Sequence, residues 1–195
     1  EIYSIPSFFF EKHKQNKLVK RWMKRRPEIL AAALSLLAAS AAAEPRFAPV
    51  PMPPHEYTGG WEHFVGGGLA VFDCSGDGLP ELYAAGGTAR AQLLHNDSTP
   101  GGAIAFSAQT PPPLALTGVT GAYPLDIDGD GILDLAVLRV GENRLLRGLG
   151  ACRFAPFETL GFTSPPAWTT AFSATWEGGN QRPTLAFGNY VDRAN

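Results

Sequence analysis

The sequence predicts an all-β fold built from tandem four-stranded repeats and preceded by a signal peptide. An acidic nine-residue loop occurs twice, 53 residues apart from Asp73 to Asp126, and each copy leads into an apolar run typical of a buried strand. Around each loop, short strand-like segments alternate with clusters of Gly, Pro, Asn and Asp. A unit of about 50 residues with four strands indicates a repeat architecture.

The first part of the chain predicts export. Met23 is followed by a positive stretch (24–26), an apolar stretch (29–39) and small residues at 41–43, the pattern of a cleaved secretory signal. We therefore expect residues 23–43 to be a signal peptide. The alternative is a membrane anchor, but the apolar run is shorter than the roughly 20 residues that a spanning helix needs.

Residues 1–22 have no clean periodicity, and we interpret them as an upstream extension that is not native. Residues 44–56 are rich in proline and predict an extended lead-in. From Glu44 onward the chain holds 8 Arg against 15 Asp or Glu and no Lys, a net charge of −7. This balance argues against nucleic-acid binding, which needs clustered basic side chains. After signal cleavage we expect no membrane span.

The first repeat is expected at about 57–110. Trp61, His63 and Phe64 near its start favour aromatic packing of a strand over a ligand site. The strands that the pattern predicts are 69–72, 82–85, 91–95 and 103–106.

The second repeat is expected at about 114–160, with strands at 121–125, 135–140, 144–147 and 153–157. An incomplete third repeat is expected at about 165–195, because 185–187 matches 135–137 at an offset of 50 residues. Four short strands per unit are typical of a propeller blade. Because propellers usually close with about 4–8 blades, we expect the chain to be the N-terminal fragment of a longer protein.

The second loop, 126–134, is the stronger candidate for a cation site. Carboxylates stand at loop positions 1, 3, 5 and 9, and a glycine at position 6 allows the turn. The carbonyl of the residue at position 7 adds a backbone oxygen. Such an oxygen set favours Ca²⁺ over Zn²⁺ or copper. The predicted ligands are Asp126, Asp128, Asp130, Ile132 and Asp134.

The first loop, 73–81, repeats the pattern with a hydroxyl at position 3, and its predicted ligands are Asp73, Ser75, Asp77, the Leu79 carbonyl and Glu81. With three carboxylates against four, this site is expected to bind Ca²⁺ less tightly than the second. Neither loop is an EF-hand, since position 12 of the second is Val137, inside the apolar run. In the third repeat, the corresponding loop, 176–184, lacks carboxylates at these positions and is expected to bind no metal.

Two cysteines, Cys74 and Cys152, lie in neighbouring repeats. They could pair with each other on one face, stay free, or pair with a cysteine outside this sequence, because spacing alone does not set connectivity.

Both loops resemble the FG-GAP or VCBS repeat of integrin-like β-propellers, whose pattern is DxDxDGxxD between two strands. In that family a strand with leucine, an aromatic residue, any residue and asparagine follows, and then a hairpin; residues 93–96 and 145–148 stand where this strand belongs. Residues 57–195 look most like secreted bacterial proteins similar to cartilage acidic protein (the ASPIC/UnbV family), although no ASPIC/UnbV module is visible. The resemblance implies a partial β-propeller.

The expected function is that of a non-enzymatic, calcium-binding propeller that is secreted, periplasmic or on the cell surface. It would bind a protein or carbohydrate ligand. One alternative is the non-catalytic part of a larger secreted enzyme. Another is a phosphatase of the haloacid dehalogenase type, since Asp126 and Asp128 resemble its nucleophile and general acid. That family expects Thr or Val where Asp130 stands, and it gives no reason for a second copy at Asp73.

Overall fold

The structure is a computed structural model that describes residue 20 and residues 47–64 and 67–191. The chain divides into two units between Pro49 and Val50, and all the strands described below belong to the second unit. The predicted signal peptide and almost all of the upstream extension lie outside the described residues. Among the residues that are described, no helix is long and apolar enough to cross a membrane.

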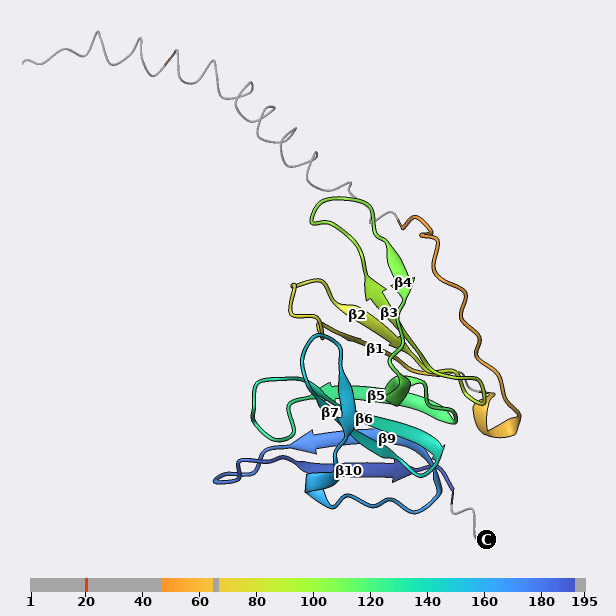
Figure 1. The fold of residues 1–195 in the computed structure, drawn as a ribbon, viewed down its shortest axis with the longest axis vertical. Coiled ribbons are helices and arrows are strands. Elements are labelled where there is room, and N and C mark those ends of the chain that lie inside the picture. The colour runs from red at the N-terminus through yellow and green to blue at the C-terminus, as the bar shows by residue number, and fades with distance from the viewer. Residues whose placement is uncertain (1–19, 21–46, 65–66, 192–195) are drawn as a thin grey trace, which may run out of the picture. The chain divides into compact units, whose positions relative to one another are not determined.

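The first repeat is a four-stranded antiparallel sheet in which the strands lie in chain order (Figure 1). It comprises β1 (Leu69–Phe72), β2 (Glu81–Ala84), β3 (Gln92–Asn96) and β4 (Phe106–Ala108). The predicted strands are confirmed in number and order. The fourth begins three residues later than expected, because Ser98 binds both backbone polar groups of Ala105 and keeps that residue in the preceding turn.

The second repeat has the same order and forms one sheet with the third. Its strands are β5 (Val119–Leu125), β6 (Asp134–Gly141), β7 (Arg144–Gly148) and β8 (Phe154–Pro156). The third repeat contributes β9 (Ala167–Thr175) and β10 (Thr184–Asn189), and the start of β9 pairs with the end of β6. All pairings in both sheets are antiparallel.

The all-β class is thus confirmed over 47–64 and 67–191, where the only helical elements are three short 3-10 turns. These are η1 (Trp61–His63), η2 (Pro112–Leu114) and η3 (Glu158–Leu160). The expectation that Trp61 and Phe64 pack in a strand is wrong. Trp61 begins a 3-10 turn after Gly60 and Phe64 follows it. The two rings stack on each other with their centroids 4.6 Å apart and are about two-thirds exposed, while His63 is buried.

Two apolar clusters hold the repeats together. The first joins the first and second repeats and includes Phe72, Tyr83, Leu93, Leu135 and Val137. The second joins the second and third repeats through Ile127 and Ala136, with Phe172 and Phe187 packed against it. Because side chains alternate along a strand, Leu135 and Val137 face one cluster and Ala136 faces the other. Burial on both faces explains the continuous apolar run of β6.

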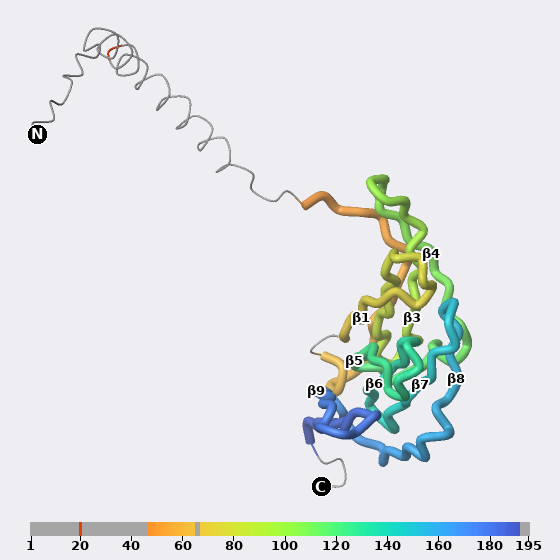
Figure 2. Tube along the Cα trace, turned by 90° about the vertical axis from the view of Figure 1, so that its left-hand side faces the viewer, coloured from red at the N-terminus to blue at the C-terminus, as the bar shows by residue number. Residues whose placement is uncertain are grey.

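The first strands of the three repeats, β1, β5 and β9, follow one another through the unit (Figure 2). The Gly68 N–H donates to the Thr120 carbonyl, and the Thr120 hydroxyl donates to the Thr169 carbonyl. A Cβ at Gly68 would come within 3.1 Å of the Gly121 Cα, so any side chain here would require the two backbones to move apart by a few tenths of an ångström. The repeats therefore meet along their first strands, although the described residues do not form a closed ring.

Candidate cation-binding loops

Each acidic loop connects the first two strands of its repeat. In the first repeat, the last paired residues on either side of the loop are Phe72 and Glu81. In the second repeat they are Leu125 and Asp134. In the third repeat the last paired residues are Thr175 and Thr184, so the strand register and the loop length are the same as in the other two repeats. The three loops are thus equivalent in the fold, as the sequence offsets predicted.

The carboxylate at position 1 organises each loop. In the first, Asp73 accepts the N–H groups of Gly76 (2.7 Å) and Gly78 (2.8 Å). In the second, Asp126 accepts those of Gly129 (2.8 Å) and Gly131 (2.9 Å).

All four glycines have φ between 79° and 84°, a conformation that other residues adopt only with strain. The glycines therefore let successive N–H groups point inward at one carboxylate. These hydrogen bonds hold the pKa of Asp73 below its ordinary value, the largest cause being the Gly76 N–H.

Positions 3 and 5 complete the inner side of the loop. The position-5 carboxylates are equivalent, since Asp77 accepts the Leu79 N–H and Asp130 accepts the Ile132 N–H. Position 3 differs, because the Ser75 hydroxyl donates to Asp73 at 3.2 Å whereas Asp128 brings a further negative charge. One oxygen from each of Asp126, Asp128 and Asp130 lies within 4.8 Å of the other two. The second loop thus gathers three carboxylates around one point.

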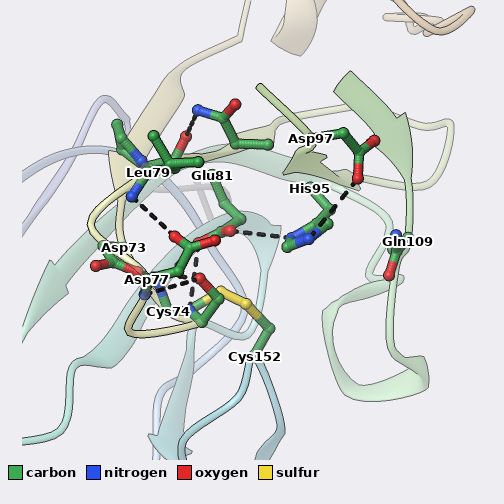
Figure 3. Close-up of polar contacts among 12 residues, drawn as sticks. Asp73, Cys74, Asp77, Leu79, Glu81, His95, Asp97, Gln109 and Cys152 are labelled. Atoms are coloured by element: carbon green, nitrogen blue, oxygen red, sulfur yellow. Dashed lines mark hydrogen bonds and ion pairs between the residues drawn. A yellow bond between two sulfur atoms is a disulfide. The ribbon is translucent and has the colours of Figure 1, made fainter. Parts of the chain in front are cut away.

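The carboxylate at position 9 is fully buried in both loops. Asp134 accepts the Ile127 N–H with one oxygen and the Gly148 N–H with the other, both at 2.8 Å. Glu81 accepts the Cys74 N–H at 2.8 Å, and its second oxygen lies 3.0 Å from His95 Nδ1 (Figure 3). This residue therefore ties the loop to the third strand of its own sheet. Burial raises the pKa of Asp134, although both hydrogen bonds oppose that shift.

A basic side chain on the third strand faces the second loop. Arg147 on β7 places Nε 3.0 Å from Asp128 and Nη2 2.9 Å from Asp130. The position equivalent to Arg147 in the first repeat is His95, which lies beside Glu81 and 3.8 Å from Asp97. Within residues 47–64 and 67–191, no Lys or Arg forms an ion pair with Asp73 or Asp77.

The position-2 residues link each loop to the following repeat. Cys74 forms a disulfide with Cys152, which lies in the turn between β7 and β8, so the open question of their pairing is answered (Figure 3). The Cys152 N–H also donates to the Cys74 carbonyl at 2.9 Å. In the second loop the same position holds Ile127, which belongs to the apolar cluster shared with the third repeat. Since both sulfurs near Glu81 are bonded to each other, they are not available as thiolate ligands.

The donors present in both loops fit a hard cation. Every side-chain donor at positions 1, 3, 5 and 9 is an oxygen, as Ca²⁺ prefers, and in the second loop three of them already converge. Asp134 and Glu81 sit at the inner end of their loops with their oxygens engaged by N–H groups or His95. In the third loop, Glu177 accepts hydrogen bonds from the backbone and side chain of Asn180.

Sequence reasoning missed the contributions of Arg147 and His95. Both stand in the third strand of their repeat, one strand beyond the strand that the loop enters, at a position that the loop pattern does not include. Their equivalence could have been found by aligning 93–96 with 145–148, but the contact of Arg147 with two loop carboxylates required the hairpin geometry.

Residues 73–137, which span both loops, match the family model of the FG-GAP-like repeat. A search of curated proteins and a search of solved structures each found no match. An FG-GAP-like repeat is therefore present, and it is the type of repeat that the two loops resemble. Relationship to one particular protein family beyond this repeat stays a prediction.

Proposed function

We propose that this chain supplies calcium-stabilised blades of a β-propeller in a secreted, periplasmic or cell-surface protein, and that the module binds a protein or carbohydrate ligand without catalysing a reaction. The observation that carries the proposal is the shared hydrogen-bond pattern of the two acidic loops. In each, glycine N–H groups at positions 4 and 6 fix the position-1 carboxylate, and the buried position-9 carboxylate closes the loop.

Calcium would act mainly on stability. Three or four carboxylates crowded into nine residues repel one another, and a bound divalent cation replaces this repulsion with coordination. In each loop the ligands would be the oxygens at positions 1, 3, 5 and 9 together with the carbonyl at position 7. The ion would brace the loop edge of each sheet, where a partner could make contact.

The arrangement of the sheets supports the propeller part of the proposal. Consecutive repeats pack on each other through apolar clusters and meet along their first strands, as neighbouring blades of a propeller do. The FG-GAP-like repeat supports an interaction role for the module. Partners of such folds are set by loop surfaces and not by the fold itself.

The disulfide supports an extracytoplasmic location. Cystine bridges persist in oxidising compartments and are rare in the cytosol. Cys74 and Cys152 are the two cysteines of the chain, and they join neighbouring repeats. The bridge agrees with the predicted signal peptide at 23–43, which stays a prediction.

Calcium titration followed by calorimetry tests the proposal. With chelator-treated protein, we expect two binding events and a rise in the unfolding temperature with added Ca²⁺. Mg²⁺ at the same concentration should raise it less, since it demands a smaller octahedral site. The Asp128→Ala variant should lose Ca²⁺ binding at the second loop, and the Asp77→Ala variant should lose it at the first. Equal unfolding temperatures with chelator and with excess Ca²⁺ would contradict the structural role of the ion.

The phosphatase alternative has its own test. Hydrolysis of a generic phosphomonoester should stay at the background rate in wild-type protein supplied with Mg²⁺. Turnover that is abolished by Asp126→Asn but kept by Asp130→Asn would overturn the non-enzymatic assignment, because only the first substitution removes the nucleophile of that mechanism.

A further inference from the structure

We propose that Arg147 is an internal counter-cation of the second loop, whose charge competes with a bound metal ion and cancels the advantage of the fourth carboxylate. This inference rests on the proposed calcium function. It concerns a residue of the third strand and not the loop ligands themselves.

The contacts of Arg147 place its charge at the candidate site. The guanidinium lies 3.0 Å from Asp128 and 2.9 Å from Asp130, two of the three carboxylates that converge. The opposite oxygens of both carboxylates face backbone N–H groups at 3.3 Å and 2.9 Å. The guanidinium therefore engages the carboxylate oxygens that the loop backbone leaves available. Its position is supported from β7 and by the Phe157 ring, 5.9 Å from the Arg147 Cζ.

The net charge of each loop, with Arg147 included, changes the expected order of Ca²⁺ affinities. The second loop has four carboxylates and one facing guanidinium, which leaves −3. The first loop has three carboxylates and also carries −3, with the facing His95 counted as neutral. Affinity in such loops follows ligand charge and site rigidity. The expectation that the second loop binds more tightly came from counting carboxylates alone. With Arg147 included, the two loops should bind Ca²⁺ with similar affinity in the wild-type chain.

When Ca²⁺ binds in the second loop, Arg147 can respond in one of two ways. Either the guanidinium leaves and its two ion pairs are lost, or it stays and its charge repels the ion across a short distance. Both weaken binding at the second loop and leave the first loop unchanged. Removing the charge should therefore strengthen one site selectively.

The test compares Ca²⁺ titrations of wild type, Arg147→Gln and Arg147→Met with Arg144→Gln as the matched control. Arg144 is on the same strand, has similar exposure and pairs with Glu142 at 2.8 Å, outside the loops. Both charge-removing variants lack the ion pairs with Asp128 and Asp130 that compete with the metal. We therefore expect them to bind Ca²⁺ roughly threefold to thirtyfold more tightly at the second loop. Arg147→Lys, which keeps the charge, should stay near wild type, and Arg144→Gln should not change either site.

The outcomes separate the inference from the proposed function. If wild type binds two ions and both Arg147 variants match Arg144→Gln, the counter-cation role is wrong and calcium binding stands. If neither wild type nor folded Arg147 variants bind Ca²⁺, both proposals fall. A stability readout adds to the test. Arg147→Met should lower the unfolding temperature in chelator and lose that deficit in excess Ca²⁺, whereas a purely structural arginine would leave the same deficit in both.

Discussion

The two acidic loops share a backbone and differ in what surrounds it. In both, glycine N–H groups bind the first carboxylate and a buried ninth carboxylate closes the loop. Around the first loop the structure places a disulfide and a histidine. Around the second it places an apolar contact and an arginine paired with two loop carboxylates. The acidic positions and the glycines therefore specify the loop, while position 2 sets its attachment to the next repeat and the third strand sets the charge that faces it.

Position 2 gives the clearest contrast. Cys74 attaches the first loop to the second repeat by a covalent bond across 78 residues, whereas Ile127 attaches the second loop to the third repeat by packing alone. The same position thus performs the same task by two kinds of interaction. Reduction of the disulfide should therefore weaken the junction between the first and second repeats and leave the junction between the second and third unchanged.

The largest expected effect comes from removing the covalent attachment. Replacing both cysteines by serine should lower the free energy of unfolding by about 2–5 kcal/mol, because the unfolded chain regains the freedom of a long closed loop. Denaturant unfolding under oxidising conditions measures the loss. Wild type in reductant should approach the double variant. Ile127→Ala keeps the bridge, so its loss relative to wild type, about 2–4 kcal/mol, should be the same with and without reductant. Insensitivity of wild type to reductant would argue that the bridge does not stabilise the junction.

Removing the carboxylate at position 9 should cause the next largest loss of unfolding free energy. Asp134→Ala leaves the buried N–H groups of Ile127 and Gly148 without an acceptor, and each such group costs about 1–3 kcal/mol. Since the burial that raises the pKa of Asp134 also makes its charge costly, we expect a net loss of about 2–4 kcal/mol. Chelator in the buffer removes any metal contribution.

The control for this variant is Glu142→Ala, which removes an exposed carboxylate whose side chain is 51% accessible. It should change stability by less than about 0.5 kcal/mol. A loss for Asp134→Ala that is no larger than the control would show that the ninth carboxylate does not hold the loop closed.

Acidification should affect positions 1 and 9 in opposite directions. Backbone N–H groups lower the folded-state pKa of Asp73, so its contribution is present above the ordinary value of 3.8 and is lost as pH falls through the lowered value. Burial raises the pKa of Asp134, so its charge destabilises the fold increasingly as pH rises from 3.8 through the raised value.

Denaturant unfolding in chelator from about pH 6 down to about pH 2.5 measures both effects. The destabilisation caused by Asp73→Asn should shrink as pH falls, and that caused by Asp134→Asn should grow. Parallel pH profiles for wild type and Asp73→Asn would contradict the role of the glycine N–H groups at position 1.

The sequence predicted the strands and the loop equivalence because both follow from local patterns. Alternating strand-like segments and a repeated Asp-Gly spacing are local features, and the register of the third loop followed from the 50-residue offset between 135–137 and 185–187. The structure of Trp61 and Phe64 was not predicted because Gly59 and Gly60 favour a turn over the aromatic strand preference. The role of Arg147 depends on which strand folds back against the loop, which is not encoded within the loop itself.

We propose that both acidic loops bind Ca²⁺ and that the charge of Arg147 opposes the ion only in the second loop. The sharpest test is a crystal structure of the protein with bound Ca²⁺, in which anomalous difference density locates the ions. We expect one ion within 73–81, one within 126–134 and none within 176–184. Absence of density in both acidic loops at saturating Ca²⁺ would contradict the proposal.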